Sequence, residues 1–191
     1  MRSVLVYACL FILLMAGVLA YNYNNHITMS GSTASAAPAQ LRIPRMHVDA
    51  SVLSVGTTAS GQMDAPVSNA VNSPYWTSVF WYDLGTAPGQ AGNAVIAGHV
   101  DRVGGDPAVF WSLGSLQRGD SIFVTDGNNS TLKFVVDRVV NYPATSPGQE
   151  ALQVVFGPTT AHHLNLITCS GAWTAHGYDQ RLVVFSTQVD A

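Results

Sequence analysis

Short apolar runs separated by glycine, proline and polar turns fill most of this chain, and this pattern predicts strands rather than long helices. Residues 126–129 (Asp-Gly-Asn-Asn) are a strong turn signal between two such runs and predict a β-hairpin. Residues 61–66 resemble an edge strand that is closed by Pro66. The predicted strands are residues 41–44, 48–55, 61–66, 93–99, 121–125, 131–141, 164–169 and 181–188.

Helical signals are few and short. Residues 73–90 place a group of aromatic side chains before a Gly/Pro-rich stretch, which predicts a short helix and a loop whose rings pack on the core. Residues 106–117 predict a brief helix that is capped by Asp106, with Pro107 at its first position. Residues 142–163 are longer than most loops, so we expect them to be functional or partly helical. The fold class that follows is mostly β, a single small barrel with short helices.

The amino-terminal segment has a different character from the rest. Residues 4–20 carry no charge and follow Arg2, which predicts a transmembrane helix with its amino end in the cytoplasm. We therefore expect a membrane anchor and flank at 1–27, a small, polar flexible spacer at 28–40 and an extracellular domain at 41–191. The alternative is a cleaved signal peptide, for which residues 34–36 (Ala-Ser-Ala) offer a cleavage site.

The charge composition argues against nucleic-acid binding. The chain has 8 Lys+Arg, of which only Lys133 is a lysine, and its net charge is −3, so no basic stripe exists to follow a phosphate backbone. Low charge together with many glycines and prolines also fits a turn-rich β protein.

Three side chains capable of acyl-transfer chemistry lie at the ends of predicted strands. Cys169 closes one apolar run, His99 closes another, and Arg181 precedes a third. Cys9, the other cysteine, lies in the apolar amino-terminal segment, so we expect no disulfide and an unpaired exported thiol. A buried, inert cysteine is the competing interpretation. A thiol, an imidazole and a guanidinium are together sufficient for acyl transfer.

The flanks of these residues resemble the sortase family of cysteine transpeptidases. The matching segments are 96–101 (Ile-Ala-Gly-His-Val-Asp), 166–171 (Leu-Ile-Thr-Cys-Ser-Gly) and 178–184 (Tyr-Asp-Gln-Arg-Leu-Val-Val), and the resemblance extends over 41–189. It implies a closed barrel of about eight strands and no cofactor. The short amino terminus and the plain domain look most like class F (or class E) sortases. One departure is Asn165, which replaces the first threonine of the family's Thr-Leu-x-Thr-Cys pattern.

The resemblance also implies a role for each residue of the site. Cys169 would attack a peptide carbonyl and form a thioacyl-enzyme, His99 would protonate the leaving amine, and Arg181 would hold the substrate or the oxyanion. The substrate would be an L-P-x-T-G-like sorting signal of a surface protein, cut between Thr and Gly. The acceptor would be an amine of a cell-wall precursor or a pilin, with water as the default.

Residues around the trio are expected to support it. Those expected to bind substrate are Thr168, Ala97, Trp173 and Ser170. Asn165 is expected to support the site from behind, and Asp101 either to orient His99 or to face solvent. No metal site is expected, because adjacent histidines such as His162 and His163 project to opposite faces of a strand.

Two other classes of protein remain as alternatives. A caspase-like peptidase also places a histidine before a strand-end cysteine, but it characteristically has glycine after the histidine, whereas Gly98 precedes His99 here. A papain-like enzyme has the opposite order of cysteine and histidine. A non-catalytic, anchored β-barrel adhesion module would explain the anchor, the spacer and the barrel, but not the free thiol.

Overall fold

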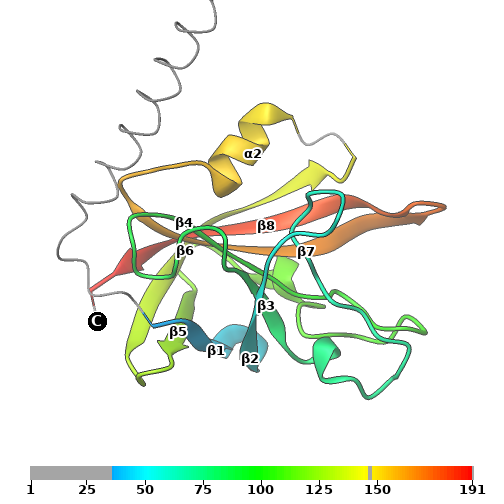
Figure 1. Ribbon diagram of the computed structural model, residues 1–191, viewed down its shortest axis with the longest axis horizontal. Helices are drawn as coiled ribbons and strands as arrows, with labels where there is room; N and C mark the ends of the chain where they lie inside the picture. The colour runs from blue at the N-terminus through cyan, green and yellow to red at the C-terminus, as the bar shows by residue number, and fades with distance from the viewer. Residues whose placement is uncertain (1–35, 146–147, 191) are drawn as a thin grey trace, which may run out of the picture. The chain divides into compact units, whose positions relative to one another are not determined.

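Eight strands close into a barrel in the order β1-β2-β3-β4-β7-β8-β6-β5 (Figure 1). The computed structural model describes residues 36–145 and 148–190 of the 191. The strands are β1 (Pro38–Ile43), β2 (Val48–Val55), β3 (Val79–Tyr82), β4 (Gly92–Ala97), β5 (Ser121–Asp126), β6 (Thr131–Pro143), β7 (His162–Thr174) and β8 (Gly177–Val189). Two neighbouring pairs, β2–β3 and β4–β7, are parallel, and the other pairs are antiparallel. The expected mostly β, closed eight-stranded barrel with few short helices is confirmed.

The alternation of side chains along the strands separates an inner core from an outer face. On β7, Leu164 and Leu166 belong to the main buried cluster, together with Ile96 of β4 and Val184 of β8. The residues between them point the other way: Val95, Val183 and Phe185 form a second cluster with Val155, and Ile167 packs against it. The odd-numbered positions of β4, β7 and β8 therefore lie on the outer face of the barrel.

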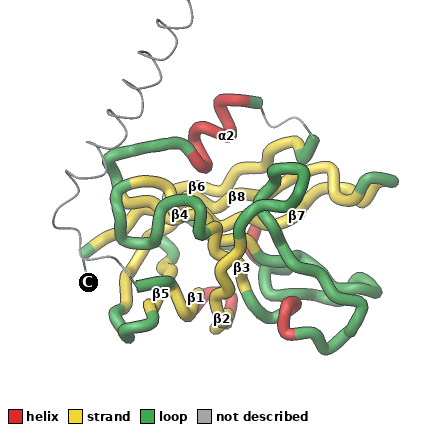
Figure 2. Tube along the Cα trace, viewed as in Figure 1, coloured by secondary structure: helices red, strands yellow, loops and turns green. Residues whose placement is uncertain are grey.

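One α-helix covers part of this outer face. Helix α2 (Gln149–Phe156) lies in the connection between β6 and β7, and its Val155 is part of the outer cluster. The other helices among the described residues are single 3-10 turns, namely η1 (Pro44–Met46), η2 (Pro74–Trp76) and η3 (Leu113–Ser115), and Figure 2 shows how short these helical segments are beside the strands. The prediction that residues 142–163 are partly helical is confirmed.

Three local predictions were wrong, and in two of them pairing with a more distant segment overrides a local signal. Residues 61–66 form no strand, and Met63 makes only an isolated bridge with Thr57. The predicted helix at 73–90 is reduced to η2, and the following aromatic residues form β3, which pairs with β2.

The predicted helix at 106–117 is also absent. Ala108 and Phe110 donate their backbone N–H groups to the carbonyls of Val100 and His99, which holds this segment against the chain that leaves β4. The Asp106 carboxylate, expected as a helix cap, instead accepts a hydrogen bond from Arg102 at 3.1 Å. Only the 3-10 turn η3 forms later in the segment.

The boundaries of the closing strands differ from the predicted ones. β7 continues past Cys169 to Thr174, and β8 begins before Arg181, so both residues lie within a long hairpin rather than at strand ends. The hairpin extends because residues 173 and 174 pair again with β8 beyond an irregularity that follows Ser170. At the other end of the domain, β1 already begins at Pro38, before the predicted start at Leu41.

The predicted membrane helix and most of the predicted spacer lie outside the described residues. Within residues 36–145 and 148–190, no helix has the length and apolar character that crossing a membrane requires.

Candidate active site

Cys169 and Arg181 face each other across the β7–β8 hairpin. They are directly opposite in the antiparallel register, and both occupy odd-numbered positions on the outer face of the barrel. Cys169 is a free, partly buried cysteine. The hairpin thus brings a thiol and a guanidinium to the same level of two adjacent strands.

His99 reaches the same level from the other side of β7. In the parallel pairing of β4 with β7, Ala97 is opposite Ile167. The register continues past the end of β4, because Gly98 donates its N–H to the carbonyl of Ile167 at 3.0 Å and the Thr168 hydroxyl donates to the carbonyl of Gly98 at 2.8 Å. His99, two residues past the end of β4, therefore lies at the level of Cys169, and the backbone of the three sequence-predicted residues is at one level of the barrel.

Two opposite charges act on the Cys169 thiol. Its pKa is raised above the ordinary value, chiefly because burial disfavours the thiolate. The guanidinium of Arg181 lowers this pKa, and the carboxylate of Asp101 raises it. Arg181 and Asp101 are thus both close enough to the sulfur to influence it.

The imidazole of His99 is held by the connection between β2 and β3. Its Nε2 lies 2.9 Å from the carbonyl oxygen of Pro66. A carbonyl only accepts, so Nε2 carries the hydrogen, and Nδ1 is left as the nitrogen for proton exchange. The ring packs against Trp76 and Phe80, with centroids 5.0 and 5.4 Å away. The predicted core role of these aromatics therefore extends to positioning His99.

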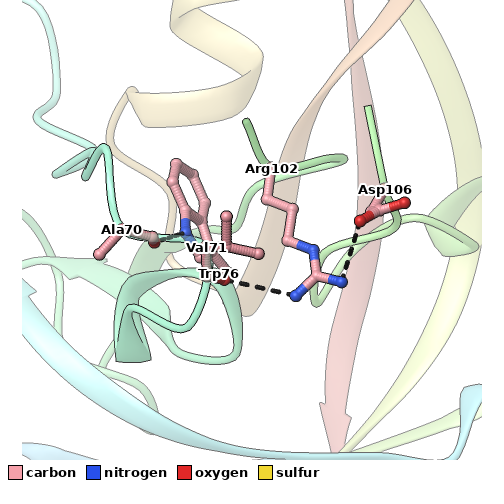
Figure 3. Close-up of polar contacts among 5 residues, drawn as sticks. All are labelled: Ala70, Val71, Trp76, Arg102 and Asp106. Atoms are coloured by element: carbon pink, nitrogen blue, oxygen red, sulfur yellow. Dashed lines mark hydrogen bonds and ion pairs between the residues drawn. The ribbon is translucent and has the colours of Figure 1, made fainter. Parts of the chain in front are cut away.

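Arg102 braces the connection that carries these contacts (Figure 3). Its guanidinium donates to the carbonyl of Val71 at 3.3 Å and to Asp106 at 3.1 Å. Close by, the indole N–H of Trp76 donates to the carbonyl of Ala70 at 2.8 Å. The sequence did not predict these contacts, because neither composition nor residue spacing indicates that Arg102 pairs with a backbone carbonyl.

Asp101 pairs with a residue that sequence reasoning did not single out. The phenol of Tyr178 donates to the Asp101 carboxylate at 2.6 Å, and this hydrogen bond raises the pKa of Tyr178 to about 12. The contact joins the segment after His99 to the start of β8, just ahead of Arg181. Tyr178 does open the third matching sequence segment, and that was the only available signal.

The other expected substrate-binding residues occupy different settings. Thr168 is buried, 5% exposed, and its hydroxyl is used by Gly98, so it fixes the strands rather than facing a substrate. Ala97 is partly buried at the end of β4. Ser170 donates its hydroxyl to the side-chain oxygen of Asn141 at 2.9 Å. Trp173 is 73% exposed, and its ring meets that of Tyr178 edge-on at 5.1 Å.

Asn165 supports α2 rather than the trio. It is fully buried, and its amide donates to the carbonyl of Val155 at 2.8 Å and to the side chain of Asn93 at 3.1 Å. Asn93 in turn donates to the carbonyl of Gly157 at 2.7 Å. The two side chains thus donate hydrogen bonds to carbonyls at the carboxyl end of α2 that the helix itself leaves unpaired.

The guanidinium of Arg181 also folds back onto its own strand. One of its nitrogens donates to the carbonyls of Tyr178 at 3.1 Å and Gln180 at 2.9 Å. These bonds fix the planar group and leave other N–H donors of the fork for a ligand. In the part of the chain that the structure describes, no group of three His, Cys, Asp or Glu side chains is arranged to hold a metal ion.

Comparisons with known proteins identify the family and agree with the fold. The model of the sortase domain family matches residues 41–189. Similar solved structures include sortase C-1 from Actinomyces oris (20% identity, TM-score 0.58, covering 80% of this chain and 72% of that chain). A Clostridium perfringens sortase D5 transpeptidase is 18% identical (TM-score 0.57, 81% and 79%), and sortase A from Corynebacterium diphtheriae is 20% identical (TM-score 0.59, 84% and 64%). A search of curated proteins found no match.

Proposed function

The chain belongs to the sortase family of cysteine transpeptidases, and we propose that it cleaves an L-P-x-T-G-like sorting signal of surface proteins between Thr and Gly. The acyl fragment passes to an amine of a cell-wall precursor or a pilin. The observation that carries the proposal is the placement of Cys169 directly opposite Arg181, with His99 at the same level just past the end of the adjoining strand β4.

The first half-reaction forms a thioacyl-enzyme. The sulfur of Cys169 attacks the carbonyl carbon of the Thr–Gly bond as a thiolate, and the C–N bond breaks. His99 gives a proton to the departing glycine amine, and Nδ1 is the nitrogen available for this transfer. Arg181 faces the thiol and stabilises the oxyanion, a contribution worth about 100–1000-fold in rate for a single donor of this kind.

The second half-reaction consumes the thioester. The nitrogen of the acceptor attacks the acyl carbon, the C–S bond breaks with its electron pair on sulfur, and His99 takes the proton that the attacking nitrogen releases. Without an amine, water takes the same place and the product is a free acid. The ratio of the two products therefore reports how well the site binds its acceptor.

The remaining features of the proposal concern subclass and location. Within the family, class F or class E is the subclass that the sequence resemblance implies. The uncharged stretch 4–20 after Arg2 supports a single-pass anchor with the catalytic domain outside the cell. Protease digestion of intact cells tests the location, since an external domain is degraded while cytoplasmic proteins survive.

Mass spectrometry of the enzyme incubated with an L-P-x-T-G peptide and triglycine tests the reaction. We expect a thioacyl adduct on Cys169, cleavage after threonine and a peptide–triglycine product. Cys169→Ala removes all three while keeping the far-UV circular dichroism spectrum, and Cys9→Ser is the matched control that retains them. Turnover in Cys169→Ala excludes the mechanism.

A further inference from the structure

Asp101 is a carboxylate placed where it works against the thiol. Its charge raises the pKa of Cys169 and so reduces the fraction of thiolate. A site built only to generate a nucleophile gains nothing from this charge. Asp101 therefore needs a role in the reaction other than activation of the thiol.

The carboxylate is held rigidly in this place from two directions. Its side chain accepts the phenol of Tyr178 at 2.6 Å, and its backbone forms an isolated bridge with Pro107. Tyr178 satisfies only one of the several hydrogen bonds that a carboxylate accepts. Asp101 is also partly exposed, so a ligand can reach the remaining lone pairs.

One aromatic residue, Tyr178, contacts this carboxylate, and a second, Trp173, packs on Tyr178. Trp173 is 73% exposed at the end of the β7–β8 hairpin, and it packs edge-on against Tyr178, which binds Asp101. A carboxylate bound by a tyrosine, with an exposed tryptophan packed on that tyrosine, is a setting that attracts a cation, through Coulomb attraction and through the negative faces of the rings.

One participant in the proposed reaction is such a cation. The acceptor is a primary amine, and α-amino and lysine amines titrate near 8 and 10.4, so most of it arrives as ammonium at neutral pH. The sorting peptide has no comparable cationic group at its scissile bond.

We propose that Asp101 recognises the ammonium group of the incoming acceptor, with Trp173 and Tyr178 as the aromatic wall beside it. This inference rests on the proposed transpeptidase function. Asp101 binds and orients the ammonium, which loses one proton to solvent to become a nucleophile. The C–N bond then forms, the C–S bond breaks with its electron pair on sulfur, and the second proton passes to His99.

The test is the partition of one thioacyl-enzyme between hydrolysis and aminolysis, which cancels any change in the rate of acylation. Triglycine serves as the charged acceptor, and hydroxylamine serves as an acceptor that is uncharged at neutral pH. We expect Asp101→Asn to lower the aminolysis-to-hydrolysis ratio with subsaturating triglycine by roughly fivefold, the effect of one exposed charge pair. The ratio with hydroxylamine stays close to that of the wild type.

The matched control is Asp49→Asn, which removes the same charge from β2, on a strand that is not adjacent to β7. We expect it to leave both ratios unchanged. Equal losses with triglycine and hydroxylamine in Asp101→Asn, or an unchanged triglycine ratio, overturn the proposal. A loss of kcat/KM for the sorting peptide at an unchanged ratio also overturns it, and places Asp101 on the peptide side.

A measurement on the unaltered enzyme keeps the proposal testable if Asp101→Asn does not fold. Salt screens exposed charges, so rising ionic strength must lower the triglycine ratio more than the hydroxylamine ratio. Parallel responses of the two acceptors contradict the proposal. If the wild-type enzyme forms no thioacyl adduct at all, it is the proposed function that fails, which is a different result.

Discussion

The hydroxyl of Thr168 donates to the carbonyl oxygen of Gly98 at 2.8 Å, and this bond joins β7, which carries Cys169, to the segment after β4 that carries His99. Thr168 immediately precedes Cys169 in the chain, and Gly98 immediately precedes His99. The position of His99 relative to Cys169 therefore depends on how closely the backbone of Gly98 can approach its surroundings.

Gly98→Ala is expected to disturb this approach. An added Cβ would lie 2.5 Å from the ring of Phe110, which is fully buried and has little room to move. We expect a loss of about 1–3 kcal/mol in the free energy of unfolding, typical of overpacking, together with a lower kcat. Urea denaturation and peptide-cleavage assays measure the two effects. Gly127→Ala, whose Cβ would meet only the Ala37 carbonyl at 3.9 Å, is the control, and Phe110→Leu should partly rescue Gly98→Ala.

Thiol reactivity should respond in opposite directions to the two charges near Cys169. Arg181→Ala removes the charge that lowers the thiol pKa, so alkylation by iodoacetamide at a fixed pH should slow. Asp101→Asn removes the charge that raises this pKa, so alkylation should accelerate. Mass spectrometry in a Cys9→Ser background follows the one remaining thiol. Changes of the same sign in both variants would contradict this electrostatic description of the site.

Asn165→Asp should destabilise the protein although it hardly changes the shape of the side chain. The amide of Asn165 donates to Val155 and Asn93 in a fully buried position, and a carboxylate would place negative charge against those oxygens. We expect a loss of about 3 kcal/mol or more at neutral pH, as for an uncompensated buried charge. Urea titration measures it. Asn72→Asp, on the exposed β2–β3 connection, should cost less than about 0.5 kcal/mol.

The Tyr178–Asp101 hydrogen bond predicts a stability difference that depends on pH. The folded state raises the pKa of Tyr178 to about 12 from an ordinary value of 10.0, so the neutral phenol is favoured. The stabilisation is complete below about pH 10 and is lost as the pH rises towards 12. Tyr178→Phe should therefore be less stable than wild type by about 1 kcal/mol at neutral pH, a modest value because the pair is near solvent. The two unfolding curves should converge above pH 10, and a gap that persists there would refute this account.

The sequence predicted those parts of the fold that depend on interactions between residues close together in the chain. The Asp-Gly-Asn-Asn turn predicted the β5–β6 hairpin because its residues interact within a few positions. β3 was missed because Val79–Tyr82 shows no alternation, and its parallel partner β2 lies far back in the chain. The capping signal at Asp106 is real, but pairing with the chain after β4 and the ion pair with Arg102 outweigh it.

The candidate site also contains residues that the sequence predicted and contacts that it could not predict. Cys169, His99 and Arg181 were predicted as site residues from their flanks, and the register places all three at one level. The contacts that hold the site residues in place could not be predicted from the sequence. The partner of Asp101 stands 77 residues away, and the carbonyl of Pro66 is a backbone group that every residue has. Thr168 was expected to bind substrate, but its hydroxyl donates to the carbonyl of Gly98, because a buried hydroxyl needs a partner.

The long β7–β8 ribbon implies an order in which the chain becomes competent. Sulfur and guanidinium sit on adjacent arms of one hairpin, only 12 positions apart, whereas the imidazole belongs to a strand that joins through contacts between residues 70 positions apart. Closing the longer loop costs more entropy, so we expect the ribbon to form before the parallel partner docks. A folding intermediate that contains only the ribbon would then hold the thiol opposite the guanidinium of Arg181 but would lack the imidazole for proton transfer. Activity would appear only after β4 has docked.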